Sequence, residues 1–207
     1  MIFFRIPKNA STTIHRGYLQ PNYVTLNERT NNKGFLKWRE NVSYEWFQEA
    51  FKFTFVRNPW DRFVSLYVYF TTYAPKKKGA PLADRWTGLI PSFKEFVMDF
   101  EKIIETRTDI NNHATLQSLF AFDDGDQYVD FVGRFENLKE DFEFVRSGLG
   151  LKIEGLDHMM KTEHDHYSAF YDEETRQKVS EMFKLDIHSF GYRFYQSKLV
   201  ARQDDLT

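Results

Sequence analysis

Short apolar runs alternate with stretches of helical periodicity along this chain. The runs at 2–6, 53–56 and 128–132, with a weaker one at 23–26, have the length and composition of buried strands. Amphipathic or well-capped segments lie between them, as expected where strands and helices alternate. The pattern predicts an α/β fold in which a parallel sheet is flanked by helices, built as a single domain over residues 1–207.

The helical segments are recognised by periodicity or by their starts. Segments 13–19 and 44–51 are expected to be helices. Further helices are expected to begin after residues favoured at the N-cap: Asn58 before Pro59 (helix to about Tyr73), Ser92 (to about Ile104), Asn137 (with Glu140 in a capping box) and Asp172 (through Phe183). The polar segment 27–41 and the segment 73–91, which contains several Pro and Gly residues, are predicted to be loops.

The segment between the first strand and its helix has the features of an anion site. It reads Pro7-Lys8-Asn9-Ala10-Ser11-Thr12-Thr13. Amides at a helix N-terminus point out of the helix, small residues let an anion approach them, and Lys8 adds a mobile cation. The segment predicts a phosphate or sulfate cradle, although an ordinary capped turn has the same local pattern. It is not a Walker A loop, because it has no glycine and its lysine precedes the turn.

A second candidate anion site follows the strand at 53–56. Arg57 stands at the carboxyl end of that strand, and Ser65 lies about two turns into the next helix. The carboxyl ends of parallel strands share one edge of a sheet, so Lys8 and Arg57 are expected at the same rim. Arg57 offers a planar fork suited to phosphate, although a structural ion pair is the ordinary alternative. A ligand with two separated phosphate groups would fit such a pair of sites.

Composition excludes several classes of function. The formal charge is −2 and the pI about 6.3, which gives no global attraction for nucleic acid. The absence of cysteine excludes disulfides, thiolate catalysis and Cys-type zinc sites. The sequence has no membrane-spanning run, and residues 1–6 are too short for a signal peptide, so we expect a cytoplasmic protein.

At both anion-site segments the sequence resembles the sulfotransferases that use 3′-phosphoadenosine 5′-phosphosulfate (PAPS), especially the carbohydrate (family 2) branch. Segment 7–13 resembles that family's 5′-phosphosulfate loop, and Val56 to Arg62 with Ser65 and Tyr67 resembles its 3′-phosphate motif. Two further stretches are similar to the same branch and keep its order: 132–138 with Asp141, and 167–172 continued by Asp186-Ile187 and Phe190-Gly191-Tyr192. The resemblance therefore covers nearly the whole chain.

The resemblance implies a P-loop-NTPase-like sulfotransferase fold, PAPS as donor, adenosine 3′,5′-bisphosphate as product and no metal. Lys8 to Thr13 would hold the 5′-phosphosulfate, and Arg57 and Ser65 the 3′-phosphate. Lys161 and Thr162 would lie in a late loop that closes over the nucleotide. The acceptor would be a hydroxyl, in this branch on a sugar, polysaccharide or glycolipid.

The expected reaction is in-line attack of the acceptor oxygen on sulfur, which is catalysed mainly by positioning and charge stabilisation. Lys8 would neutralise charge on the bridging oxygen. A His or Glu would take the acceptor proton; His113 matches a family position, and Glu40 lies between the two motifs, where several relatives carry their base. The spacing of His158, His164 and His166 is not that of a metal site.

Two other functions remain open from the sequence. A nucleotide-dependent kinase-like enzyme would share the strand–loop–helix arrangement, but the chain lacks Walker glycines and a clear Mg²⁺-binding Asp. A non-catalytic module that binds the nucleotide would need no general base. The chain does not indicate the oligomeric state.

Overall fold

The computed structural model describes residues 1–18, 24–26, 44–73, 91–150 and 165–195. The chain divides into two compact units. Unit 1 comprises residues 1–57 and 115–161, and unit 2 comprises residues 58–114 and 162–207. Among the described residues, no helix is both long and apolar enough to span a membrane.

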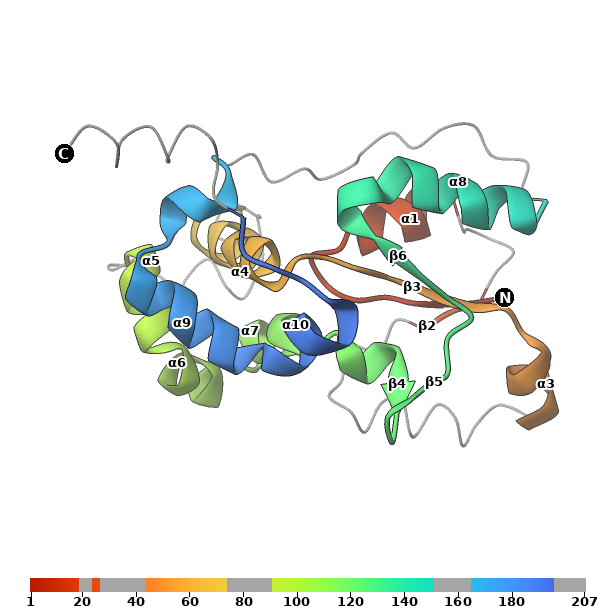
Figure 1. The fold of residues 1–207 in the computed structure, drawn as a ribbon, viewed down its shortest axis with the longest axis horizontal. Coiled ribbons are helices and arrows are strands. Elements are labelled where there is room, and N and C mark those ends of the chain that lie inside the picture. Colours follow the sequence, from red (N-terminus) through yellow and green to blue (C-terminus); the bar gives the residue numbers. More distant parts are fainter. Residues whose placement is uncertain (19–23, 27–43, 74–90, 151–164, 196–207) are drawn as a thin grey trace. The chain divides into compact units, whose positions relative to one another are not determined.

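Unit 1 is built on a parallel sheet. Its strands are β1 (Ile2–Phe4), β2 (Val24–Leu26), β3 (Lys52–Val56) and β6 (Phe131–Arg134), in the order β2-β1-β3-β6. All three neighbouring pairs are parallel. The helices of this unit are α1 (Ser11–Tyr18), α3 (Tyr44–Glu49) and α8 (Leu138–Gly148). A parallel sheet flanked by helices was the predicted fold class, and it is confirmed (Figure 1).

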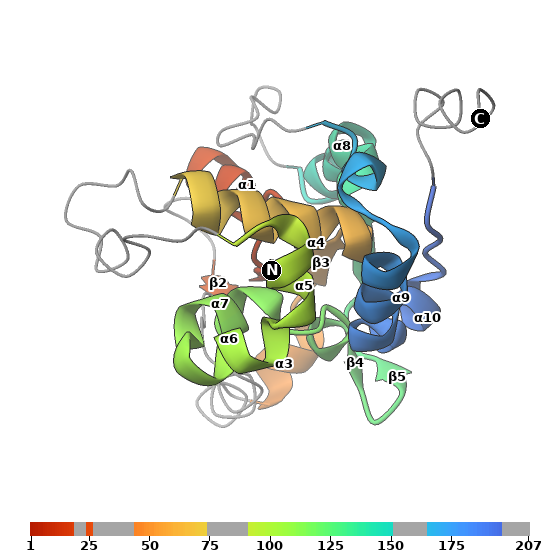
Figure 2. The ribbon, with the colours of Figure 1, turned by 90° about the vertical axis from the view of Figure 1, so that its left-hand side faces the viewer.

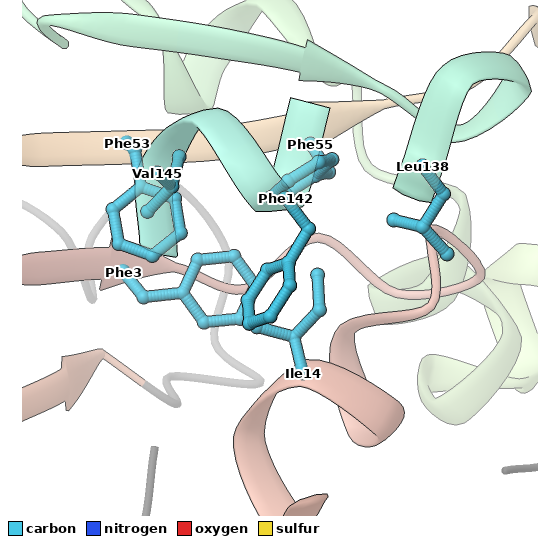
Figure 3. Close-up of a cluster of buried hydrophobic side chains, with 7 residues drawn as sticks. All are labelled: Phe3, Ile14, Phe53, Phe55, Leu138, Phe142 and Val145. Atoms are coloured by element: carbon cyan, nitrogen blue, oxygen red, sulfur yellow. The ribbon is translucent and has the colours of Figure 1, made fainter. Parts of the chain in front are cut away.

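The core of unit 1 follows from the alternation of side chains along its strands. Phe3 of β1 and Phe53 and Phe55 of β3 project to the face that carries α1 and α8 (Figure 3). There they pack against Ile14 from α1 and, from α8, Leu138, Phe142 and Val145. The next residues along, such as Phe4 and Val56, are also at most 2% exposed. Burial of both faces explains why these strands read as continuous apolar runs.

One glycine is required by this packing. Gly133 of β6 stands opposite Phe55 of β3 in the strand register. A Cβ at position 133 would lie 2.4 Å from the Phe55 ring. Because that ring is only 1% exposed, it has little room to withdraw.

Unit 2 is helical, and Figure 2 looks onto its helices. They are α4 (Pro59–Val68), which continues as a π-helical turn (Tyr69–Tyr73), α5 (Phe93–Met98), α6 (Phe100–Thr106), α7 (Thr108–Ala114), α9 (Glu173–Met182) and α10 (Lys184–Phe190). A short 3₁₀ helix spans Tyr167–Phe170. The centre of the unit is aromatic: Phe63 packs its ring against those of Phe93, Phe96, Phe100 and Phe183.

Three predicted helix starts are confirmed. Asn58 caps α4 by accepting from the amide of Trp60, with Pro59 in the first turn. Ser92 and Asp172 each cap their helix through a capping box. The predicted end near Tyr73 is also where the π-helical turn stops.

The predicted start after Asn137 is also where α8 begins, but its capping was wrong. The Asn137–Glu140 capping box is not formed, because a 3₁₀ turn leads directly into α8 and the Asn137 side chain caps nothing. Instead the Asp141 carboxylate accepts from the Arg134 amide at 2.5 Å. The helix expected from Phe93 to Ile104 is divided at Asp99 into α5 and α6.

Two further elements differ from the prediction. The fourth strand of the sheet begins at Phe131 instead of 128, since the chain first makes a small antiparallel hairpin of β4 (Phe122–Asp123) and β5 (Asp126–Gln127). Helix α10 was not anticipated. Most of the two predicted loops, 27–41 and 73–91, lies outside the described residues.

Candidate active site

The first predicted anion-site segment follows β1, the strand at which the strand order of the sheet reverses. From β1 the chain moves outward to β2 and then returns to β3 on the other side of β1. In open parallel sheets such a reversal separates the connections that leave adjacent strands and leaves a ligand site at their carboxyl ends. The residues leaving β1 include Lys8, and the residue leaving β3 is Arg57.

The loop after β1 has an alternating backbone conformation. Lys8 (φ 71°) and Ala10 (φ 55°) are left-handed, and Asn9 between them is not. Alternation of this kind turns successive amides toward one side and forms an anion-binding concavity. The left-handed region is costly for non-glycine residues, about 1–2 kcal/mol each, so the surrounding structure must impose it.

Helix α1 begins at Ser11, two residues earlier than predicted, and Ala10 accepts its first hydrogen bond from the Ile14 amide at 3.1 Å. Ser11, Thr12 and Thr13 therefore form the first helical turn, whose amides point out of the helix. That turn contains no acidic residue. The segment thus brings together main-chain donors, hydroxyls and one lysine, and its binding of an anion stays a prediction.

Asn9 anchors the loop to the sheet. Its side chain is fully buried, and its Nδ2 donates to the Phe55 carbonyl and to Gln117 Oε1, both at 2.7 Å. Its Oδ1 is buried and accepts no hydrogen bond from the described residues. A water or a ligand hydroxyl at the loop would satisfy this oxygen.

Arg57 is brought to the same loop. Its guanidinium donates from Nη1 to the Lys8 carbonyl at 3.1 Å and lies 4.0 Å above the Phe135 ring. Stacking uses the flat face of the guanidinium and leaves its N–H groups, which lie in the plane, directed past the ring. The prediction that the Lys8 and Arg57 segments meet at one rim is confirmed by this contact.

Gln117 was missed as a site residue. Its Oε1 accepts from the Arg57 amide and its Nε2 donates to the Arg57 carbonyl, both at 2.9 Å. The sequence around it gives no signal beyond its place four residues after His113. Phe135, the residue on which Arg57 stacks, was also not singled out.

The predicted phosphate ligand Ser65 lies in unit 2, in the middle of α4, and is 1% exposed. Its role as a partner of the 3′-phosphate stays a prediction. Glu40, Lys161 and Thr162 lie outside the described residues.

His113, also in unit 2, is held from several sides near the end of α7. Its ring stacks on Tyr69 (centroids 5.8 Å apart, planes at 21°) and meets Phe70 edge-on at 5.2 Å. Its Nδ1 is 2.7 Å from the Asp109 carbonyl, which can only accept. In the neutral ring the proton is therefore on Nδ1, and Nε2 carries the lone pair. Arg62 donates to the His113 carbonyl at 2.9 Å.

The tautomer matters for chemistry, because Nε2 is then the nitrogen able to accept a proton. Neighbouring contacts make the arrangement stiff. Asp109 is held by two hydrogen bonds from Arg107 (3.0 and 2.9 Å), which keep the pKa of the Asp109 carboxyl below its usual value although partial burial acts to raise it.

In the described ranges no group of three or more His, Asp or Glu is placed to hold a metal.

Comparison with curated proteins and with solved structures gave no match. A family model described as "Sulfotransferase family" matches residues 1–193, which is most of the chain and includes both anion-site segments. Members of this family are enzymes that move a sulfuryl group from a sulfate donor to an acceptor hydroxyl. The chain belongs to the sulfotransferase family, in its family 2 branch.

Proposed function

We propose that this enzyme transfers a sulfuryl group from PAPS to a carbohydrate hydroxyl by in-line displacement, and that it works in the cytoplasm. The observation that carries the donor assignment is the contact between two predicted anion sites. The Lys8 loop and Arg57 follow adjacent strands and touch at 3.1 Å. A donor with a 5′-phosphosulfate and a 3′-phosphate suits two cationic segments placed side by side. The lack of cysteine suits a reducing compartment.

The residues present fit such a donor. Left-handed Lys8 and Ala10 and the first turn of α1 offer amide donors, and the chain adds the Lys8 ammonium and the Arg57 fork. Donors and cations of this kind suit phosphate and sulfate oxygens. The donor, when bound, supplies the activated sulfuryl group and adenosine 3′,5′-bisphosphate as the leaving group.

Each part of the loop has a task in this proposal. The amides of residues 8–13 bind the sulfuryl oxygens, and the Lys8 ammonium neutralises negative charge on the bridging oxygen. Arg57 and Ser65 bind the 3′-phosphate, and Lys161 and Thr162 cover the nucleotide. Preorganised donors of this kind act without reorganisation cost during the reaction, and removing one of them typically slows an enzyme by roughly 10²–10³-fold.

His113 is the proposed general base, since its Nδ1–H is engaged with the Asp109 carbonyl and its Nε2 is the accepting nitrogen. Its ring is half-buried and held by aromatic neighbours, which limits rotation. Glu40 is the second candidate, carried over from the position between the two motifs. Without a base in either place, the chain would be a nucleotide-binding module.

A carbohydrate acceptor is supported by the family branch and by one feature of unit 2. Tyr73 ends the π-helical turn that begins at Tyr69, the residue stacked on His113, and its side chain is 37% exposed. An exposed aromatic ring on this turn could stack on a sugar. The 73–91 segment also contains Trp86, which could stack on a sugar ring, and Lys76 to Lys78, which could contact an anionic glycan; these residues lie outside the described part of the chain.

The first test is calorimetric titration with adenosine 3′,5′-bisphosphate, with ATP and adenosine 5′-monophosphate as comparators. We expect micromolar binding that requires the 3′-phosphate. Arg57→Ala should weaken it at least tenfold. Arg57→Lys, which keeps the charge and loses the planar fork, is the second variant to measure if Arg57→Ala does not fold. Arg146→Ala, at a partly exposed arginine of α8 that pairs with Glu143, is the matched control. If ATP binds as tightly as the bisphosphate, or if the bisphosphate does not bind, PAPS is not the donor.

A second experiment, which measures turnover, tests the proposed class of acceptor. Purified enzyme with PAPS should sulfate members of a panel of oligosaccharides and glycolipids in preference to phenols and amines. Activity should persist in EDTA, because no metal is proposed. Binding of the bisphosphate with no turnover on any acceptor would favour the non-catalytic module, and Mg²⁺-dependent phosphoryl transfer from ATP would favour the kinase-like enzyme.

A further inference from the structure

We propose that Gln117 is a positioning residue that holds the Lys8 loop and Arg57 in register, so that one ligand can occupy both anion sites. The proposal rests on the proposed donor, because it concerns how the two phosphate-binding segments act together. Gln117 is not itself assigned any contact with the ligand.

Gln117 binds the backbone of Arg57 as a neighbouring strand would. Its Oε1 accepts from the Arg57 amide and its Nε2 donates to the Arg57 carbonyl, each at 2.9 Å. The last residue of β3 that pairs with β6 is Val56, opposite Arg134. One residue beyond that pairing, the side-chain amide of Gln117 satisfies the backbone in place of a strand, and so fixes the point where Arg57 leaves the sheet.

The same side chain also reaches the loop after β1. Gln117 Oε1 accepts a second hydrogen bond, from Asn9 Nδ2, at 2.7 Å. Asn9 lies between the two left-handed residues Lys8 and Ala10. One oxygen therefore joins two segments that are 108 and 60 residues away from it in the sequence.

Burial makes this junction strong. Gln117 and Asn9 are both fully buried, and Arg57 is 6% exposed. In such surroundings hydrogen bonds are electrostatically stronger than in water, and a lost partner leaves a buried donor or acceptor unsatisfied. An apolar residue at 117 would release the Arg57 amide, the Arg57 carbonyl and Asn9 Nδ2 together.

The expected consequence is specific to ligands that bridge the two sites. A ligand with two phosphate groups gains from two preorganised sites only if their spacing is already correct. A ligand with one phosphate can bind at either site without regard to the other. Loss of Gln117 should therefore penalise the bisphosphate much more than either monophosphate, whereas a general loss of folded protein would weaken all three ligands equally.

The experiment compares adenosine 3′,5′-bisphosphate, adenosine 5′-monophosphate and adenosine 3′-monophosphate by calorimetry on wild type and Gln117→Met. We expect the bisphosphate to bind roughly tenfold or more weakly in the variant, and each monophosphate to change less than about threefold. Gln127→Met is the matched control, since Gln127 donates one hydrogen bond to the Val129 carbonyl in the same unit. It should change none of the three affinities.

The outcomes separate the two proposals. Equal weakening of all three ligands in folded Gln117→Met, or no weakening, overturns the positioning role while leaving the donor assignment intact. A wild type that prefers the bisphosphate over neither monophosphate overturns the donor assignment, and the positioning role with it. If Gln117→Met does not fold, Gln117→Asn, which keeps the amide but shortens its reach, should give the same selective loss at smaller size.

Discussion

Lys8 in unit 1 and His113 in unit 2, the residues given the most direct chemical roles, are held in place by different means. Lys8 owes its position to main-chain conformation: two left-handed residues, an anchoring Asn9 and the start of a helix. His113 owes its position to side-chain packing, through Tyr69, Phe70 and one hydrogen bond to a helix carbonyl. A main-chain site suits an anion, which needs several converging amides, whereas a packed ring suits a base, which needs one oriented nitrogen.

This difference predicts where each region is sensitive. Around Lys8, substitutions that alter backbone freedom should have an effect of their own, separate from that of losing the side chain. Around His113, the backbone is ordinary helix, and the chemistry of the ring and its neighbours should dominate.

The largest expected effect is at the packed ring. His113→Gln should lower kcat by roughly 10²–10⁴-fold, because the variant keeps a polar side chain but loses the accepting nitrogen. Initial rates at saturating donor measure it. His188→Gln, an exposed histidine in α10, is the control and should be silent. A His113→Gln enzyme within threefold of wild type would move the base to Glu40, where Glu40→Gln should then be the slow variant.

Lys8→Met should lower kcat by roughly 10²–10³-fold, because it removes charge stabilisation and leaves the main-chain cradle intact. Its thermal unfolding should match wild type, since Lys8 is half-buried and its backbone contacts remain. Lys102→Met, at an exposed lysine of α6, provides the comparison. Unchanged kcat in Lys8→Met would mean that the amides alone supply the charge stabilisation.

Gly133→Ala tests the sheet that supports the main-chain site. The new Cβ would meet the Phe55 ring at 2.4 Å, so we expect a loss of about 1–3 kcal/mol in the free energy of unfolding. Urea denaturation measures it. Gly148→Ala in α8, where an added Cβ meets nothing within 4 Å, should be neutral or slightly stabilising. Equal stability of the two variants would show that Phe55 can repack.

Asp172→Ala tests the corresponding support in unit 2. The Asp172 carboxylate accepts from the Thr175 amide and pairs with Lys94, and these contacts hold its pKa well below the usual value. At neutral pH the variant should lose about 1 kcal/mol of stability. Because the Asp172 pKa is lower in the folded than in the unfolded protein, its carboxylate stabilises the fold fully at pH values above the unfolded pKa, about 3.9. The stability deficit of the variant should therefore shrink as the pH falls below that value. Unfolding of both proteins from pH 7 to pH 2 measures it; a deficit constant over that range would contradict it.

The smallest expected effect reverses the usual sign. Ala10→Gly should stabilise the protein by up to about 1 kcal/mol, because glycine adopts φ 55° without a Cβ penalty. Ala169→Gly, which has no such backbone, should destabilise by a similar amount. Thermal unfolding of both variants makes the comparison. A destabilised Ala10→Gly would mean that the loop is held by Ala10 packing and not by its main chain.

Much of the fold could be read from the sequence because its signals are local. Asn58 with Pro59 marks a helix start whatever lies around it, and the run at 53–56 is apolar because the strand is buried on both faces. The details that were wrong depend on neighbours. Asn137 has the right chemistry for a cap, but the chain enters α8 from a 3₁₀ turn and leaves that side chain unused.

The candidate site divides in the same way. The placement of Lys8 and Arg57 at one rim of the sheet could be predicted, because strand ends and helix starts are visible in the sequence. The left-handed backbone at Lys8 and Ala10 could not, since neither residue type favours it and only the surrounding contacts impose it. The tautomer of His113 likewise depends on which carbonyl its Nδ1 meets.

The sequence alone determined the α/β class, the order of the two anion-site segments and the family, because these depend on residue type and spacing along the chain. Tertiary structure decided that Gln117 joins Asn9 to Arg57, and that Gly133 must make room for Phe55. These contacts link residues far apart in the sequence. A buried amide or a missing Cβ acquires its meaning from the atoms packed against it, and residue types along a chain do not specify those atoms.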